Sequence, residues 1–371
     1  MGFDGVVMAD GCAIDQLNVV TGDCVRSGAA ALRAGVDIGL WDEAYGRLDE
    51  ALEKGYITEE DIDRAVLRVL ELKVKRGLFE NPLLDENRKP EDYSYEKYPQ
   101  ALQIARESVV LLENRNDILP LSKETGKIAV IGPNADAVYN QLGDYSPQVK
   151  RENCSTVLDG VRSYLGDKAV YARGCGIFDG AQEELDEAVK LAEQSDITIL
   201  VLGGSSSRFG EVSFDANGAA ISEHGVSMDC GEGVDTAEIS LPAVQRKLAE
   251  KIFATGSKVI TVIIGGRAYA LDEVAEQSDA VLYGFYPGMQ GGKAIGEILF
   301  GEVNPSGRLP VSLPRCTGQL PVYYNYKNSY RSMHYYNIPD GAAYTFGYGK
   351  SYTNFEYEDI SFGKKDVAIE E

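Results

Sequence analysis

Two acidic motifs, about 220 residues apart, contain the residue types that most clearly suggest chemistry. The first ends on Asp10, which follows the apolar run Val6–Met8. Because that run is short and rich in β-branched residues, it predicts a buried strand with Asp10 at its carboxyl end. Carboxylates in that position perform the chemistry of β/α barrels, although an Asp here could equally cap a following helix.

The second motif, DCGEGVD at 229–235, places a glycine on each side of Glu232. This pattern predicts a flexible loop that presents the carboxylate, and the long polar stretch 205–228 before it is typical of functional insertions. Taken alone, an exposed Glu in a loop is more often a solvated surface charge than a catalytic group. Paired with Asp10 it suggests glycoside hydrolysis, since retaining glycosidases need two carboxyl groups about 5–5.5 Å apart.

Charge limits the classes of partner. The 371 residues include 36 Lys and Arg against 58 Asp and Glu, a net charge of −22. This balance argues against nucleic acid and against an anionic membrane surface, while a neutral sugar remains compatible. No apolar run approaches the 18 residues of a membrane-spanning helix.

Cysteine and histidine usage excludes further classes. The six cysteines contain no CxxC pair, so we expect no metal site and no disulfide framework, and reduced thiols predict a cytoplasmic protein. The only histidines are His224 and His334, so a Ser–His hydrolase has little support. The cysteines are Cys12, Cys24, Cys154, Cys175, Cys230 and Cys316.

The first 80 residues predict a small set of elements around Asp10. We expect a helix over 12–33, a second short buried strand over 34–40, and a helix that begins at Thr58 and ends near Gly77. Asp37 is either a structural polar group or a site residue. Trp41, the only tryptophan, is either a core residue or a ring that stacks on a sugar in a substrate-binding site.

A polar segment, 81–104, predicts the boundary between two domains. Strands then alternate with amphipathic helices, which predicts an α/β domain with a mostly parallel sheet covered on both faces. The expected helices are 101–113, 155–164, 181–194, 242–254 and 291–300, and the expected strands are 127–132, 169–173, 196–203, 258–265 and 280–285.

Glycine turns at 131–134 and 202–205 follow two of these strands. A nucleotide-binding Rossmann-like protein would need GxGxxG or GxxxxGK[ST], and neither is present. The ends of such strands are nevertheless where this architecture binds ligands.

Several long strings together resemble glycoside hydrolase family 3. GFDGVVMAD at 2–10 is similar to its nucleophile motif, and ARESVVLLEN at 105–114 with LPL at 119–121 is similar to the entry into its second domain. The strings of that second domain are matched by IAVIGPNA at 128–135, PGMQGGKAI at 287–295, FGEVNPSGRLP at 300–310 and FGYGKSY at 346–352.

The resemblance implies the C-terminal remnant of a (β/α)8 barrel over 1–80, a linker over 81–104 and an α/β sandwich domain over 105–315. Residues 316–371 would form a tail toward a fibronectin type III-like domain. It also implies Asp10 as nucleophile and Glu232 as acid/base. The sequence departs from the family pattern at Gly11-Cys12 and at Thr236. An eight-stranded barrel takes about 250 residues, so we expect a truncated gene model or partial sequence.

The implied activity is retaining hydrolysis of terminal non-reducing β-D-glucosyl residues in carbohydrate catabolism, without a metal or cofactor. The substrate would be a small oligosaccharide or glycoside. A β-xylosidase of the same family and a non-catalytic carbohydrate-binding remnant are the alternatives, and the sequence predicts no oligomeric state.

Overall fold

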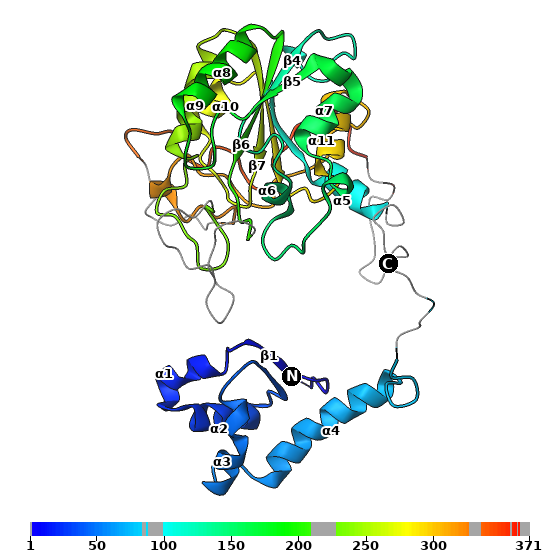
Figure 1. Cartoon of the computed structure of the whole chain (residues 1–371), viewed down its shortest axis with the longest axis vertical. Helices are drawn as coiled ribbons and strands as arrows, with labels where there is room; N and C mark the ends of the chain where they lie inside the picture. The colour runs from blue at the N-terminus through cyan, green and yellow to red at the C-terminus, as the bar shows by residue number, and fades with distance from the viewer. Residues whose placement is uncertain are drawn as a thin grey trace. The chain divides into compact units, whose positions relative to one another are not determined.

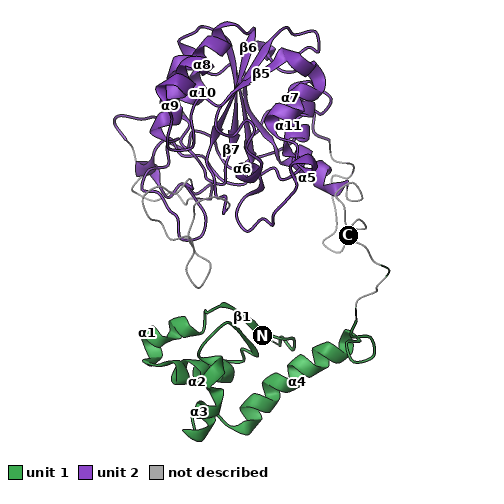
Figure 2. Cartoon of the chain, in the orientation of Figure 1, with its two compact units in different colours: residues 1–94, 215–218 green, residues 95–214, 219–371 purple. Residues whose placement is uncertain are grey.

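A computed structural model describes residues 2–83, 87, 99–208, 228–325, 335–356, 358–361 and 363. The chain divides into two compact units, which Figure 2 colours separately. Residues 2–83 lie in the first unit and residues 99–361, where described, in the second. The division at 94/95 lies inside the segment 81–104 predicted as a linker.

The first unit contains two parallel strands, β1 (Met8–Gly11) and β2 (Ile38–Leu40). The prediction that the first strand is buried is wrong, because Val7 and Met8 are 37% and 59% exposed. The physical reason is that β1 pairs only with β2 among the described residues, so the apolar side chains of this small sheet are partly uncovered. The second strand is also shorter and less buried than predicted.

Two longer helices, α2 (Cys24–Ala34) and α4 (Glu59–Lys75), also belong to this unit and contact each other. The single helix predicted over 12–33 is wrong, since Gly22 at φ +92° ends the short helix α1 (Asn18–Thr21) and Asp23 caps α2 anew. The start of α4 is confirmed by a capping box, in which Thr58 and Asp61 satisfy each other's backbone N–H groups. A short helix, α3 (Leu48–Glu53), packs against α2.

The second unit is built on a six-stranded sheet with the order β3-β8-β7-β6-β4-β5. The edge strand β3 runs antiparallel to β8, and the other pairs are parallel. All seven residues of β6 are buried, as expected for a strand covered on both faces. The strands are β3 (Val110–Asn114), β4 (Ile128–Ile131), β5 (Ala169–Ala172), β6 (Ile197–Gly203), β7 (Lys258–Ile264) and β8 (Ala280–Phe285).

Helices cover both faces of this sheet, and a hydrophobic core lies between the sheet and the helices on each face (Figure 1). One core packs under α8 (Gln182–Glu193), α9 (Ala243–Phe253) and α10 (Asp272–Gln277). The other packs under α7 (Val157–Leu165) and α11 (Gly291–Leu299), and α5 (Gln100–Ser108) contacts α11. The predicted α/β fold with a mostly parallel sheet is confirmed, while the barrel remnant stays a prediction.

One predicted element of this unit is wrong in its second half. The helix expected over 101–113 ends at Ser108, and the apolar run that follows forms β3. Val110 pairs with Tyr283 of β8, so sheet pairing overrides the helical pattern of the segment. The other predicted strands and helices of the domain agree with the structure to within a few residues.

The segment after residue 340 returns to the edge of this sheet. Leu313 and Tyr344 form a bridge, and the N–H of Lys350 donates to the carbonyl oxygen of Leu111 in β3 at 2.7 Å. The contact of Lys350 covers part of the edge strand β3, which would otherwise present unpaired backbone groups.

Candidate active site

The loop that carries Glu232 begins at a buried carboxylate. Asp229 is 6% exposed and accepts hydrogen bonds from the hydroxyl of Tyr269 and, at 2.8 Å, from the backbone N–H of Ser205. Its backbone oxygen accepts from Nε of Arg267 at 2.9 Å, and Arg267 also pairs with Asp235 at 3.0 Å. Both ends of the loop are therefore tied to the same part of the unit.

Between these ends the chain makes a tight turn. Gly231 and Val234 form an isolated bridge, and the two glycines flanking Glu232 have φ angles of +124° and +79°. Such angles are strained for other residues, so glycine is required on both sides of the carboxylate. The side chain of Glu232 is 42% exposed. The predicted glycine-flanked loop that presents Glu232 is confirmed in its geometry.

Two further side chains, Asp144 and Arg208, contact Glu232, and Tyr145 packs against Arg208. Its backbone N–H donates to Oδ2 of Asp144 at 3.1 Å, and its Oε2 lies 3.2 Å from Nη2 of Arg208. Arg208 also pairs with Asp144, and its guanidinium group lies 3.8 Å from the ring centroid of Tyr145. Sequence reasoning missed these three residues. The only local signal was a Gly-Asp pair directly after the short helix α6 (Val138–Leu142).

A network of hydrogen-bonded polar side chains lies at the strand ends next to this site. Nδ2 of Asn134 donates to the carbonyl oxygens of Gly204 and Ile264, at 3.1 and 2.9 Å, and its Oδ1 accepts from Asn140 at 2.7 Å. Asn140 in turn accepts from the hydroxyl of Ser205 at 2.8 Å. Because each buried polar group has its partner, the network fixes the strand ends relative to one another.

The position of this loop follows from the sheet topology. In the sheet, β4 lies between β5 and β6. After β4 the chain adds β5 on one side of it, and then returns to add β6 on its other side, so the strand order reverses between β4 and β6. Asn134 follows β4 and Ser205 follows β6, at the carboxyl ends of the two strands. Crevices at such a reversal of strand order are where α/β sheets bind ligands, which agrees with the sequence-based prediction for these turns.

Burial shifts the ionisation of two side chains next to Glu232. Burial raises the pKa of the Cys230 thiol to about 11, and burial likewise raises the pKa of Tyr286 well above its usual range. Both groups therefore stay protonated near neutral pH. Their Sγ and hydroxyl oxygen are 3.0 Å apart, in hydrogen-bonding contact.

Asp10 lies in the first unit, inside β1 and one residue before its end. It is exposed, and its carboxylate accepts from the backbone N–H of Gly11 at 2.8 Å. The alternative that Asp10 caps a helix is wrong, because Ile14 precedes the following 3₁₀ turn and Asp23 caps α2. Asp10 thus presents its carboxylate from a strand and not from the start of a helix.

Trp41 lies beside this strand. An added Cβ at Gly11 would be 3.3 Å from Cε3 of Trp41, so the indole ring covers the residue next to Asp10. Trp41 is 75% exposed, and the alternative that it is a core residue is therefore wrong. Trp41 and Cys12 both adopt positive φ, at +61° and +51°, an uncommon strain that clusters at functional sites.

Asp37 has a structural role. Its side chain is 1% exposed, with Oδ2 accepting from the N–H of Val7 at 2.9 Å and Oδ1 from Arg68 at 3.2 Å. The structural alternative is therefore the correct one. Asp10 belongs to the first unit and Glu232 to the second, so the spacing of about 5–5.5 Å between their carboxylates stays a prediction.

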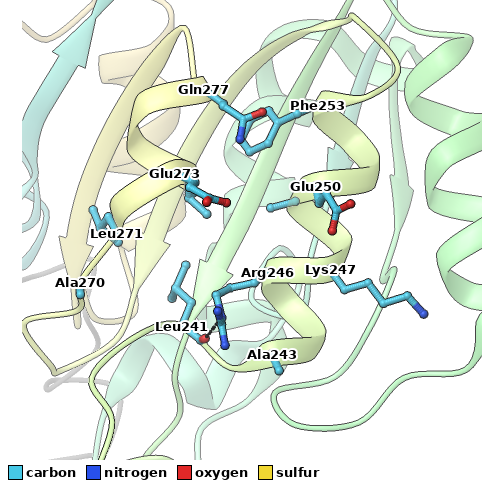
Figure 3. A pocket seen from close by; sticks show the side chains of 12 residues that line it. Leu241, Ala243, Arg246, Lys247, Glu250, Phe253, Ala270, Leu271, Glu273 and Gln277 are labelled. Carbon is cyan, nitrogen blue, oxygen red and sulfur yellow. Dashed lines mark hydrogen bonds between the residues drawn. The ribbon is translucent and has the colours of Figure 1, made fainter. Parts of the chain in front are cut away.

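A separate groove of about 390 Å³ lies along α9 and α10 (Figure 3). Arg246 lines it and donates from Nε to the carbonyl oxygen of Leu241 at 3.1 Å, with Glu250 and Glu273 nearby. None of the residues that surround Glu232 lines this groove. It is a feature of the helical layer and lies outside the candidate active site.

The remaining sequence predictions concern ligands and thiols. All six cysteines are free. The described residues contain no cluster of three His, Cys, Asp or Glu side chains arranged to bind a metal ion. His224 and His334 lie outside the described residues. Within the described ranges, no helix combines the length and apolar character that crossing a membrane requires.

Two family models match the chain. The model described as the glycosyl hydrolase family 3 C-terminal domain matches residues 109–352, and the one described as the family 3 N-terminal domain matches residues 1–72. Together they cover both units.

Similar proteins carry glycosidase names. A periplasmic β-glucosidase of Salmonella typhimurium is 35% identical over 97% of this chain and 50% of its own length. A β-xylosidase of Formosa agariphila is 33% identical over 96% of this chain and 50% of its own length. The crystal structure of a β-glucosidase from Listeria innocua in complex with isofagomine matches with a TM-score of 0.84 and 31% identity, covering 97% of this chain and 49% of that chain. The chain thus spans about half the length of the relatives it matches.

Proposed function

This chain belongs to glycoside hydrolase family 3, and we propose that the protein is a retaining β-glycosidase that releases terminal non-reducing β-D-glucosyl residues. The observation that carries the proposal is the presentation of Glu232. Its carboxylate stands on a glycine-flanked turn whose ends are anchored, at the reversal of strand order where this architecture binds ligands. Asp10, exposed on a parallel strand in the other unit, supplies the second carboxylate of the pair.

In the proposed mechanism Asp10 is the nucleophile. Its carboxylate oxygen forms a bond to the anomeric carbon while the bond from that carbon to the leaving oxygen breaks, and Glu232 donates its proton to that oxygen. Water then attacks the anomeric carbon of the glycosyl-enzyme, Glu232 accepts a proton from it, and the bond to Asp10 breaks. Two inversions give net retention, and neither displacement requires a cofactor.

The positive charge of Arg208 next to Glu232 supports the proposed role of Glu232 as a base in the second displacement. An ion pair with Arg208 needs the ionised carboxylate, which is the form that accepts the proton of water in the second displacement. Trp41, exposed beside Asp10, is proposed to bind the sugar by stacking.

The experiment that tests this proposal is covalent trapping. The natively produced protein is incubated with a 2-deoxy-2-fluoro-β-glucoside and its intact mass is measured, followed by identification of the labelled peptide. We expect one added glycosyl group on the peptide that contains Asp10, and no label on an Asp10→Asn variant. A label on a different peptide would contradict the assignment of Asp10.

A β-xylosidase is the second candidate, supported by relatives of that name at 33% and 34% identity. Glucose and xylose differ by one hydroxymethyl group, so the two readings predict opposite ratios of kcat/KM for aryl β-glucosides and β-xylosides. A higher value for the xyloside would replace the glucosidase proposal with this one.

A non-catalytic carbohydrate-binding protein is the third candidate. Binding of glucose without turnover of any aryl glycoside would favour it. The proposed ligand is in every case a small glycoside rather than nucleic acid. The compartment stays a prediction, because one relative is named a periplasmic enzyme whereas reduced thiols predict the cytoplasm.

A further inference from the structure

The backbone of Glu232 is held by a carboxylate from a different loop. Oδ2 of Asp144 accepts the hydrogen bond from the N–H of Glu232 at 3.1 Å, across 88 residues of sequence. Asp144 lies two residues beyond the end of α6, and its side chain is 18% exposed. The contact therefore joins two separate loops at the carboxyl edge of the sheet.

The position of Asp144 is itself fixed by close packing. Gly143 has a φ of +87°, and a Cβ added to it would lie 2.9 Å from Cδ2 of Tyr286. The hydroxyl of the same Tyr286 contacts Sγ of Cys230, two residues before Glu232. The turn that carries Asp144 and the loop that carries Glu232 thus pack against one tyrosine, which sets their separation.

Arg208 allows two carboxylates to lie this close. Asp144 and Glu232 would repel each other if they were unpaired, and the guanidinium group of Arg208 contacts both of them. The Arg208 side chain is only 15% exposed and lies over the ring of Tyr145, so its own orientation is restricted. Asp144 holds the backbone of Glu232, and Arg208 holds the carboxylate.

Placement of this carboxylate matters for the chemistry. A general acid must lie within hydrogen-bonding reach of the oxygen that it protonates. A displacement of roughly 1 Å can reduce the rate by about 10²-fold. Glycines on both sides make the backbone at Glu232 easy to deform. A contact from outside the loop is therefore needed to fix the direction in which the Glu232 side chain points.

We propose that Asp144 is a positioning residue for Glu232 and that Arg208 orients the Glu232 carboxylate. This inference rests on the proposed role of Glu232 as acid/base. Neither residue is assigned a contact with substrate. Their effect on the rate would therefore act through Glu232 and depend on how strongly the leaving group needs a proton.

The kinetic test uses Asp144→Ala and Asp144→Asn in the natively produced protein, with aryl β-glucosides that span good and poor leaving groups. For Asp144→Ala we expect kcat on poor leaving groups to fall by about 10- to 100-fold, with little change for good ones. Asp144→Asn keeps an oxygen acceptor and should recover most of the loss. Equal slowing for all leaving groups would mean a structural role and would overturn the proposal.

The matched control is Asp196→Asn. Asp196 also accepts a backbone N–H through its carboxylate, that of Lys127 at 2.8 Å, but it lies at the amino end of β6. We expect this variant to show no dependence on the leaving group. Glu232→Ala is the reference: if it lacks selectivity among leaving groups, the proposed role of Glu232 fails rather than the contact with Asp144.

A second readout does not need turnover. Amide hydrogen exchange should be faster in the peptide that contains Glu232 when Asp144 is replaced by Ala, and unchanged in Asp196→Asn. Unchanged exchange in Asp144→Ala would overturn the positioning role even in a protein that hydrolyses no glycoside. The two proposals can therefore fail separately.

Discussion

Tyr269 donates its hydroxyl to the carboxylate of Asp229, and both side chains are almost fully buried, at 1% and 6% exposure. Burial, with the carboxylate beside it, raises the pKa of Tyr269 far above its usual range, so the phenol remains a donor at any working pH. The N–H of Ser205 is the second donor to Asp229. This pair fixes the start of the loop that carries Glu232.

Replacing Tyr269 by Phe should destabilise the second unit. The substitution removes a hydrogen-bond donor from a buried carboxylate, which costs about 1–3 kcal/mol. We expect the urea midpoint of unfolding to fall accordingly. Tyr171→Phe is the control, because that side chain is 36% exposed on β5. An equal effect of the two substitutions would contradict a specific role for the buried pair.

Replacing Gly160 by Ala should force two helices apart. An added Cβ at Gly160 in α7 would lie 2.0 Å from the carbonyl oxygen of Gly292 in α11, a contact that the backbone cannot relieve without moving. Overpacking of this kind costs about 1–3 kcal/mol, so we expect a lower thermal midpoint. Gly318→Ala is the control, since its nearest contact would be 3.8 Å away. An unchanged midpoint for Gly160→Ala would show that α7 and α11 are not in this contact.

The acid sensitivity of α7 should depend on Asp159. Its burial would raise the pKa, but hydrogen bonds from Arg151 and Thr156 outweigh burial and hold the pKa of Asp159 below its usual range. A depressed folded pKa means that the stabilisation is present above about pH 4 and is lost as the pH falls through the folded value. Asp159→Asn should therefore cost about 0.5–1 kcal/mol at pH 7, and this cost should shrink as the pH falls below about 4.

The measurement is the free energy of unfolding of the parent protein and of Asp159→Asn between pH 2 and pH 7. The control is Asp167→Asn, on the exposed turn after α7. A deficit of Asp159→Asn that persists unchanged to pH 2 would show that the lost stability does not arise from the ionised carboxylate.

The sequence predicted the second unit well because its signals are local. Short, near-continuous apolar runs such as β6 are typical of strands covered on both faces, and the helices between them show clear amphipathic periods. The exception, β3, shows the limit of local reasoning. Its residues continue a helical pattern from α5, and only pairing with β8 makes them a strand.

The candidate site was predicted in part for the same reason. Glycines beside Glu232 are a local signal for a loop that presents a carboxylate, and the structure has that loop. Asp144 and Arg208 lie 88 and 24 residues from Glu232, and no local period connects them to it. Such partners follow from the order of strands in the sheet, which sequence patterns do not determine. The prediction that the first strand is buried was wrong because burial depends on which neighbouring elements cover the strand.

Cys230 should be unreactive in the folded protein. Burial raises its pKa to about 11, so at pH 8 only about one thiol in a thousand is ionised. We expect alkylation by iodoacetamide at pH 8 to be slow in the native protein and fast after denaturation, as followed by peptide mass. Equal rates in the two states would show that the contact with Tyr286 is not maintained in solution.

Trp41 offers a direct optical test of sugar binding, because it is the only tryptophan in the chain. Its ring is 75% exposed and covers Gly11, next to Asp10, so a sugar bound at Asp10 would displace water from the indole. We expect a blue shift and a saturable change in tryptophan fluorescence on titration with glucose, and no such change with mannitol. Trp41→Phe should abolish the signal and weaken binding by less than Trp41→Ala, because a phenyl ring still stacks. Turnover of an aryl glucoside without any change in fluorescence would show that Trp41 does not contact the sugar.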